Sequence, residues 1–203
     1  MNELDRALAD VAEIRSRIAQ ASEFRGLGPA ALAASGGLAF AVAALQSLLP
    51  GATTPAAYFT AWTLTAVAAA GLIGAEMLRR ADRHHAGLAD QMIREAVLSF
   101  LPAGVAGAAL LAVFARFAPA LLPLLPGLWL ILTSLGIFAA SRALPRAIVY
   151  GAAWYFVAGF AVLLLGLTTQ QLSPWAMGLP FAIGQLAIAA IVHLDARSRR
   201  DAS

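Results

Sequence analysis

The chain of 203 residues contains no cysteine and no lysine, and only 12% of its residues are charged. The absence of cysteine excludes disulfides, thiolate metal sites and thiol catalysis. Soluble domains usually carry about 25% charged residues. Because 61% of the residues are hydrophobic, a soluble fold of this length would leave much apolar surface in water. The composition therefore predicts an integral membrane protein.

Polar residues are scarce between residues 28 and 194 except in one long stretch, 79–95, with the sequence RRADRHHAGLADQMIRE. We expect this stretch to be a water-exposed loop. A helix of about 20 apolar residues crosses the hydrocarbon layer of about 30 Å. Apolar runs of that length predict six spans, at about 29–49, 56–78, 97–118, a fourth that starts between 121 and 128 and ends before Arg142, 147–167 and 175–194.

The sequence thus predicts an all-α fold, a polytopic bundle of six transmembrane helices arranged as three hairpins. Residues 1–27 are expected to form a cytoplasmic amphipathic helix and hinge, residues 28–194 the bundle, and residues 195–203 a cytoplasmic polar tail. The second helix of each hairpin begins with a tryptophan that is followed by a glycine, in the pairs Trp62 and Gly71, Trp129 and Gly136, and Trp175 and Gly184. This pattern fits three related hairpins, but it also fits ordinary interfacial tryptophans and the glycines common in spans. Both readings stay open.

The arginines predict the orientation. The six spans place 13 of the 14 arginines on one side of the membrane and only Arg116 on the other. Arginine-rich segments stay in the cytoplasm. We therefore expect a multi-pass protein of the cytoplasmic (inner) membrane with both termini in the cytoplasm. Because the arginines lie at the ends of apolar segments and not along one face, they do not indicate nucleic-acid binding.

Three stretches carry a resemblance to a known group of proteins. They are FLPAGVAGAALLAVF at 100–114, LPGLWLILTSLGIFAA at 125–140, and SEFRGLG at the end of the N-terminal segment. Together they resemble a group of uncharacterised bacterial six-span integral membrane proteins. The resemblance covers most of the chain. It implies the six-span architecture and supplies no site.

Residues 2–24 are predicted to form an amphipathic helix outside the membrane. Its apolar stripe has the 4-3-4-3 spacing of helix-contact positions. The segment contains five acidic residues against three arginines, whereas helices that lie on a membrane surface have a basic polar face. We therefore expect the centre of the stripe to contact a protein partner or a second copy of the chain, through Val11, Ile14 and Ile18.

Small residues are concentrated in the first half of the first span and in residues 103–108 of the third. Transmembrane helices approach closely where such residues face each other. We expect these runs, including Gly37 and Gly107, to lie at helix contacts and not to face lipid.

Candidates for metal binding and catalysis are few. His84 and His85 are adjacent, and neighbouring residues on a helix point about 100° apart, so we interpret them as a solvated pair and not as a metal site. Ser35 lies in AASGG, which is similar to the serine region of rhomboid-type membrane proteases, but this run of small residues fits close helix packing better. The sequence contains no metalloprotease, paired-acid or phosphate-loop motif. We expect no enzyme activity, no metal and no cofactor.

Three polar residues within spans are the better candidates for a site, namely Glu76, Gln185 and His193. Polar groups are costly in hydrocarbon and tend to face the bundle or a cavity. Glu76 and His193 lie at similar depths, which fits a proton-sensitive pair. It also fits two separate interface residues, with Glu76 beside Arg79 and His193 beside Asp195.

The sequence therefore predicts a non-enzymatic integral membrane protein that acts as an accessory, regulatory or scaffold module through its cytoplasmic helix. The expected partners are the lipid bilayer and a protein partner or homo-oligomer bound by the N-terminal helix. The alternative is a small transporter or channel subunit with a polar site between spans, which normally requires a polar pathway.

Overall fold

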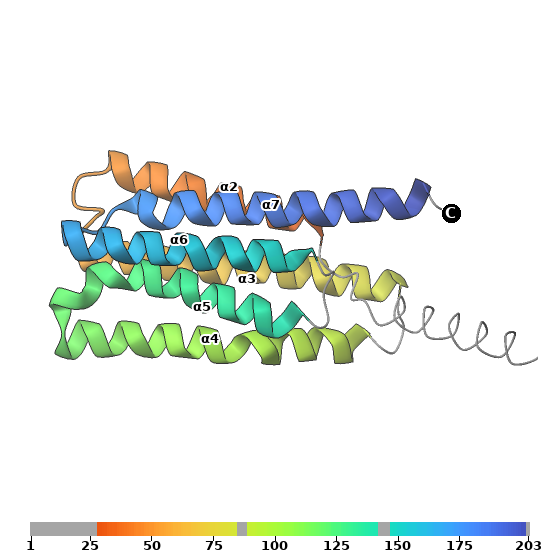
Figure 1. The fold of residues 1–203 in the computed structure, drawn as a ribbon, viewed down its shortest axis with the longest axis horizontal. Helices are drawn as coiled ribbons and strands as arrows, with labels where there is room; N and C mark the ends of the chain where they lie inside the picture. The colour runs from red at the N-terminus through yellow and green to blue at the C-terminus, as the bar shows by residue number, and fades with distance from the viewer. Residues whose placement is uncertain (1–27, 85–88, 142–146, 202–203) are drawn as a thin grey trace, which may run out of the picture.

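A computed structural model describes residues 28–84, 89–141 and 147–201, and within these ranges the chain is helical with short connections and no strand (Figure 1). The helices are α2 (Pro29–Leu48), α3 (Pro55–His84), α4 (Ala89–Phe117), the 3-10 helix η1 (Pro119–Leu124), α5 (Leu125–Ala140), α6 (Ile148–Thr169) and α7 (Pro174–Asp201). Six segments of 20 to 25 residues are long and apolar enough to cross a membrane. The predicted all-α, six-span architecture is confirmed. The stripe of Val11, Ile14 and Ile18 lies outside the described residues.

Prolines explain where the fourth span begins. Pro119 and Pro123 have no backbone N–H to donate, so they do not sustain an α-helical hydrogen-bond ladder. The connector instead forms η1, and its backbone continues directly into α5 at Leu125. The apolar span starts at Pro119, slightly before the expected window, whereas the α-helix itself starts inside that window.

The stretch 79–95 is not a loop over most of its length, and this prediction is wrong. α3 continues to His84 and α4 begins at Ala89, so only residues 85–88 lie outside the described helices. The helical parts contain neither glycine nor proline, and a helix that leaves the bilayer can continue in water. α7 likewise runs to Asp201, beyond the end of its apolar span at Asp195.

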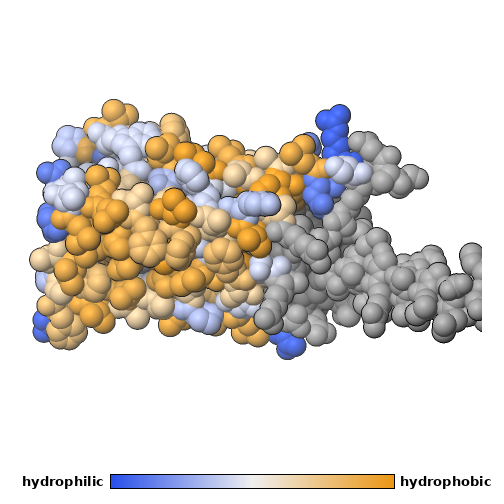
Figure 2. Space-filling model, viewed as in Figure 1, coloured by the Kyte–Doolittle hydropathy of each residue, from blue (hydrophilic) through white to orange (hydrophobic). Residues whose placement is uncertain are grey.

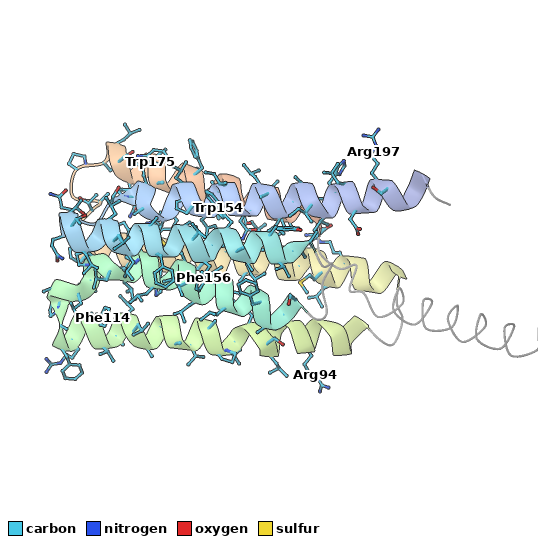
Figure 3. All side chains as sticks on the ribbon, in the orientation of Figure 1. Arg94, Phe114, Trp154, Phe156, Trp175 and Arg197 are labelled. Carbon is cyan, nitrogen blue, oxygen red and sulfur yellow. The ribbon has the colours of Figure 1, made fainter. Side chains whose placement is uncertain are left out.

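All three extensions lie at one end of the bundle, called here the arginine-rich end, where Figure 3 shows Arg94 and Arg197. The opposite end, called the far end, holds the short connections between α2 and α3 and between α6 and α7 (Figure 1). Two residues with a left-handed backbone conformation shape these connections. They are Gly51, with φ of 78°, and Gln170, with φ of 53°. The N–H of Gln170 closes the last turn of α6 on the carbonyl of Gly166 at 3.0 Å.

The two helices of each predicted hairpin contact each other, but the most extensive packing is between helices of different hairpins. α2 packs most extensively against α7, and α5 against α6. Figure 1 shows α2 and α7 side by side along their length. The weakest contact between consecutive α-helices is that of α3 with α4. Among the described residues, all helices except α4 contribute buried side chains to the core. α4 adds only partly buried side chains such as Leu110 and Phe114.

The side surface of the bundle is apolar. Figure 2 shows hydrophobic residues over most of the visible face between the two ends, with hydrophilic residues gathered at the ends. Many large apolar side chains are exposed there, among them Leu64, Val105 and Leu164. Such a belt would be unfavourable in water and matches the hydrocarbon layer of a bilayer. The structure thus supports a multi-pass membrane protein.

The small-residue runs are only partly at helix contacts. A Cβ at Gly36 would lie 3.2 Å from the carbonyl oxygen of Ala182, and one at Gly107 would lie 3.3 Å from the Trp129 ring. At Gly37 and Gly104 a Cβ would meet nothing within 4 Å. The prediction is right for Gly107 and wrong for Gly37. A run of small residues covers all sides of a helix, and only one side faces a neighbour.

Candidate functional site

The structure places the three polar residues singled out from the sequence in different surroundings. Gln185 is buried in α7, with 6% of its surface exposed. Glu76 is half-buried in α3 near the arginine-rich end, where its side chain lies against Gly28, the residue that precedes α2. His193 is exposed on α7. The described residues contain no group of three His, Asp or Glu that could hold a metal, and His85 lies outside them.

Gln185 belongs to a small polar group in the middle of the bundle. Its side chain lies beside Tyr155 of α6, and the Tyr155 hydroxyl donates to the carbonyl of Phe181 at 3.2 Å. Gly184 makes room for this arrangement, since a Cβ there would overlap the Tyr155 ring. The Oε1 atom of Gln185 has no hydrogen-bond partner among the described residues.

Several other polar side chains join one helix to another. In each case a hydroxyl or indole N–H donates to a backbone carbonyl, which satisfies the donor in a medium without water. The bonds run from Ser134 to Ala152 at 2.8 Å, from Trp154 to Pro180 at 2.9 Å, from Trp129 to Gly107 at 3.0 Å and from Tyr58 to Ser173 at 3.1 Å. These side chains fix helix positions, and no pattern in the sequence indicates their pairing.

A groove lies where α3 and α4 fail to pack closely. Its far chamber, next to the far end, has a volume of about 540 Å³ and lies between the start of α3 and the end of α4, with Leu122 of η1 among its lining residues. Its inner chamber, of about 280 Å³, is deeper in the bundle and reaches Trp129 of α5 and Phe181 of α7. Thr63 and Leu111 line both chambers, so the two chambers adjoin, and we call them together the α3–α4 groove.

Small residues create this groove. The α4 wall of the inner chamber includes Ala103, Gly104 and Gly107, and the α3 wall includes Ala66. Such side chains are too short to bridge the two helices. The α3 residues Thr63 and Leu64 on the rim are exposed, so the groove opens on the side of the bundle.

Three groups on one turn of α3 give the groove a polar strip. Thr60 and Thr63 line it, and their hydroxyls make no hydrogen bond within the described part of the chain. Trp62 lines the inner chamber and is only 2% exposed, yet its Nε1 has no partner among the described residues. The indoles of Trp129 and Trp154, in contrast, both donate to backbone carbonyls.

Sequence reasoning missed this groove because it depends on the distance between two helices. The available signal was the glycine and alanine run of α4, which we assigned to a helix contact. No known protein family, curated protein or solved structure matches this chain.

Proposed function

We propose that the protein is a non-enzymatic integral membrane module with an accessory, regulatory or scaffold role exerted at its arginine-rich end, in the cytoplasm. One observation carries the proposal. α3, α4 and α7 all extend past their apolar spans, which are bounded at this end by Arg79, Val97 and Asp195. α2 also begins here. The extensions provide a polar helical platform beside the point where the N-terminal segment joins the bundle.

The membrane-embedded helices are held together in a way that suits the role of a rigid frame. Interhelical hydrogen bonds from Ser134, Trp129 and Trp154 join α4 through α7, and α2 packs closely on α7. Such a frame would hold the platform in a fixed position. The contact itself is assigned to the stripe of Val11, Ile14 and Ile18, whose β-branched residues suit helix–helix pairing.

The alternative role as a transporter or channel subunit rests on Gln185. Its unpaired Oε1 is a polar site between spans. A conducting path needs a succession of polar groups across the membrane, whereas the residues that we find against Gln185 are Tyr155 and Gly36. The scaffold role is therefore the function that we propose.

The test is a variant with Val11, Ile14 and Ile18 all replaced by serine. We expect normal membrane insertion and loss of co-purifying protein or of self-association, because serine removes the apolar contact surface. Purification from native membranes with mass spectrometry and size analysis gives the readout. Ala9, Glu13 and Gln20 replaced by serine form the control, since helical spacing would put them away from the stripe. Unchanged partners and oligomer size in the stripe variant would contradict the proposal.

A further inference from the structure

We propose that the α3–α4 groove binds one long-chain membrane lipid. Its acyl chain occupies the inner chamber, and its ester carbonyls lie beside Thr60 and Thr63. This inference goes beyond the proposed scaffold role, because it concerns the membrane-embedded side of the bundle and does not involve the N-terminal segment.

The volume of the groove favours a slender chain over a helix from another protein. A helix about 10 Å wide that rises 1.5 Å per residue displaces about 120 Å³ per residue. The far chamber, at about 540 Å³, therefore holds fewer than five residues of helix. It is within the range of about 300–1,000 Å³ typical of pockets for small organic molecules.

The lining matches a lipid chain along its length. Apart from the polar strip and two further threonines, the lining is made of apolar or small residues, and no charged residue lines either chamber. Those two threonines, Thr65 and Thr133, donate to carbonyls of their own helices at 2.8 and 2.9 Å. The inner chamber therefore offers an acyl chain a surface with few competing polar groups.

The polar strip lies in the part of the α3 span that is nearer the far end. The apolar segment of α3, Pro55–Arg79, has 25 residues. At 1.5 Å per residue it is about 37 Å long, which exceeds the hydrocarbon layer by about 7 Å. Thr60 is about 7 Å from the far end of that segment, and Thr63 one turn deeper. With the excess length placed at the far end, the Thr60 hydroxyl lies at the boundary, where ester carbonyls can accept hydrogen bonds, and the Thr63 hydroxyl lies about 4.5 Å inside it.

The indole N–H of Trp62 is an independent reason to expect a hydrogen-bond acceptor in the groove. An indole N–H that is buried in a membrane protein without a partner is strongly disfavoured relative to a paired one. Trp62 lies between the two threonines in sequence and lines the inner chamber. A small turn of its ring toward a lipid carbonyl would pair the one indole N–H that we find both buried and unpaired among the described residues.

The first experiment fills the groove. Gly104 lines the inner chamber and has open space at its Cβ position, whereas Gly71 of α3 has equally open space but does not line the groove. Native mass spectrometry in mild detergent would count bound dipalmitoyl-phosphatidylglycerol. We expect one bound lipid per chain, an occupancy about tenfold lower in Gly104→Leu, and no change in Gly71→Leu.

The second experiment tests the carbonyl contact. Wild type should bind the diester lipid more tightly than the diether analogue, which lacks carbonyls. The double variant Thr60→Val and Thr63→Val keeps the shape of both side chains and should lose this preference. Thermal unfolding in lipid-free detergent checks that each variant is folded.

Two results would overturn the inference. One is equal lipid occupancy in Gly104→Leu and Gly71→Leu, which would mean that lipid coats the bundle without a specific site. The other is a wild-type dimer that Gly104→Leu converts to a monomer, which would identify a second copy of the chain as the occupant.

Discussion

Gly36 and Gly37 are neighbours in α2 with opposite surroundings. A Cβ at Gly36 would lie 3.0 Å from the Cβ of Gln185 and 3.2 Å from the carbonyl oxygen of Ala182, whereas one at Gly37 would meet nothing within 4 Å. Successive residues on a helix point about 100° apart. Of these two glycines, only Gly36 is therefore needed for the close approach of α2 to α7.

This difference predicts opposite effects of one substitution. Gly36→Leu should lower the free energy of unfolding by about 1–3 kcal/mol or more, because the added side chain overpacks against the backbone of α7. Gly37→Leu brings the same gain in helix propensity and should be neutral or slightly stabilising. Thermal unfolding of both variants in one detergent provides the measurement. Equal losses would show that the α2–α7 contact is wrongly placed.

At this scale, the sequence predicts how deep a residue lies in the membrane, but it does not predict the direction in which the side chain points from its helix. Counting residues along the spans places Glu76 and His193 at similar depths, which led to the hypothesis that they pair. In the structure Glu76 lies against Gly28 and His193 is exposed, and their pairing stays a prediction. The direction of a side chain around its helix axis depends on which helices are neighbours, and a single sequence does not state this.

At the scale of elements, the length of an apolar run predicts the bounds of a membrane span better than it predicts the bounds of the helix that contains the span. The first span was expected at 29–49, and α2 is Pro29–Leu48. The same reasoning ended the second helix at Leu78, although α3 continues to His84. Hydropathy records where the bilayer ends, whereas the helix ends where glycine, proline or capping residues stop it.

The pairing of α5 with α6 provides a test at the same scale. Ser134 is fully buried and donates to Ala152 of α6, whereas Ser35 is equally buried but donates to Leu32 of its own helix, also at 2.8 Å. Ser134→Ala should cost about 1 kcal/mol, because it removes a hydrogen bond between helices. Ser35→Ala should cost less, since alanine favours the helix. Unfolding measurements that rank Ser35→Ala as the worse change would contradict this account.

At the scale of the whole molecule, the number of spans was predictable and their packing was not. Six apolar runs follow from composition along the chain, but the close packing of the first span on the last joins residues far apart in sequence, such as Ala43 and Gly178. The α3–α4 groove belongs to the same class of property. It exists because two consecutive helices make few contacts, and no local pattern records a missing contact.

The central claim is a six-span bundle with its arginine-rich end in the cytoplasm, and reporter fusions test it most directly. Fusions at Gly51, Pro123 and Gln171 join the chain at the far end, and those at His85 and Ser203 join it in arginine-rich segments. The arginine distribution predicts external readings for the first three and cytoplasmic readings for the last two. An external reading at His85 would contradict the proposed orientation.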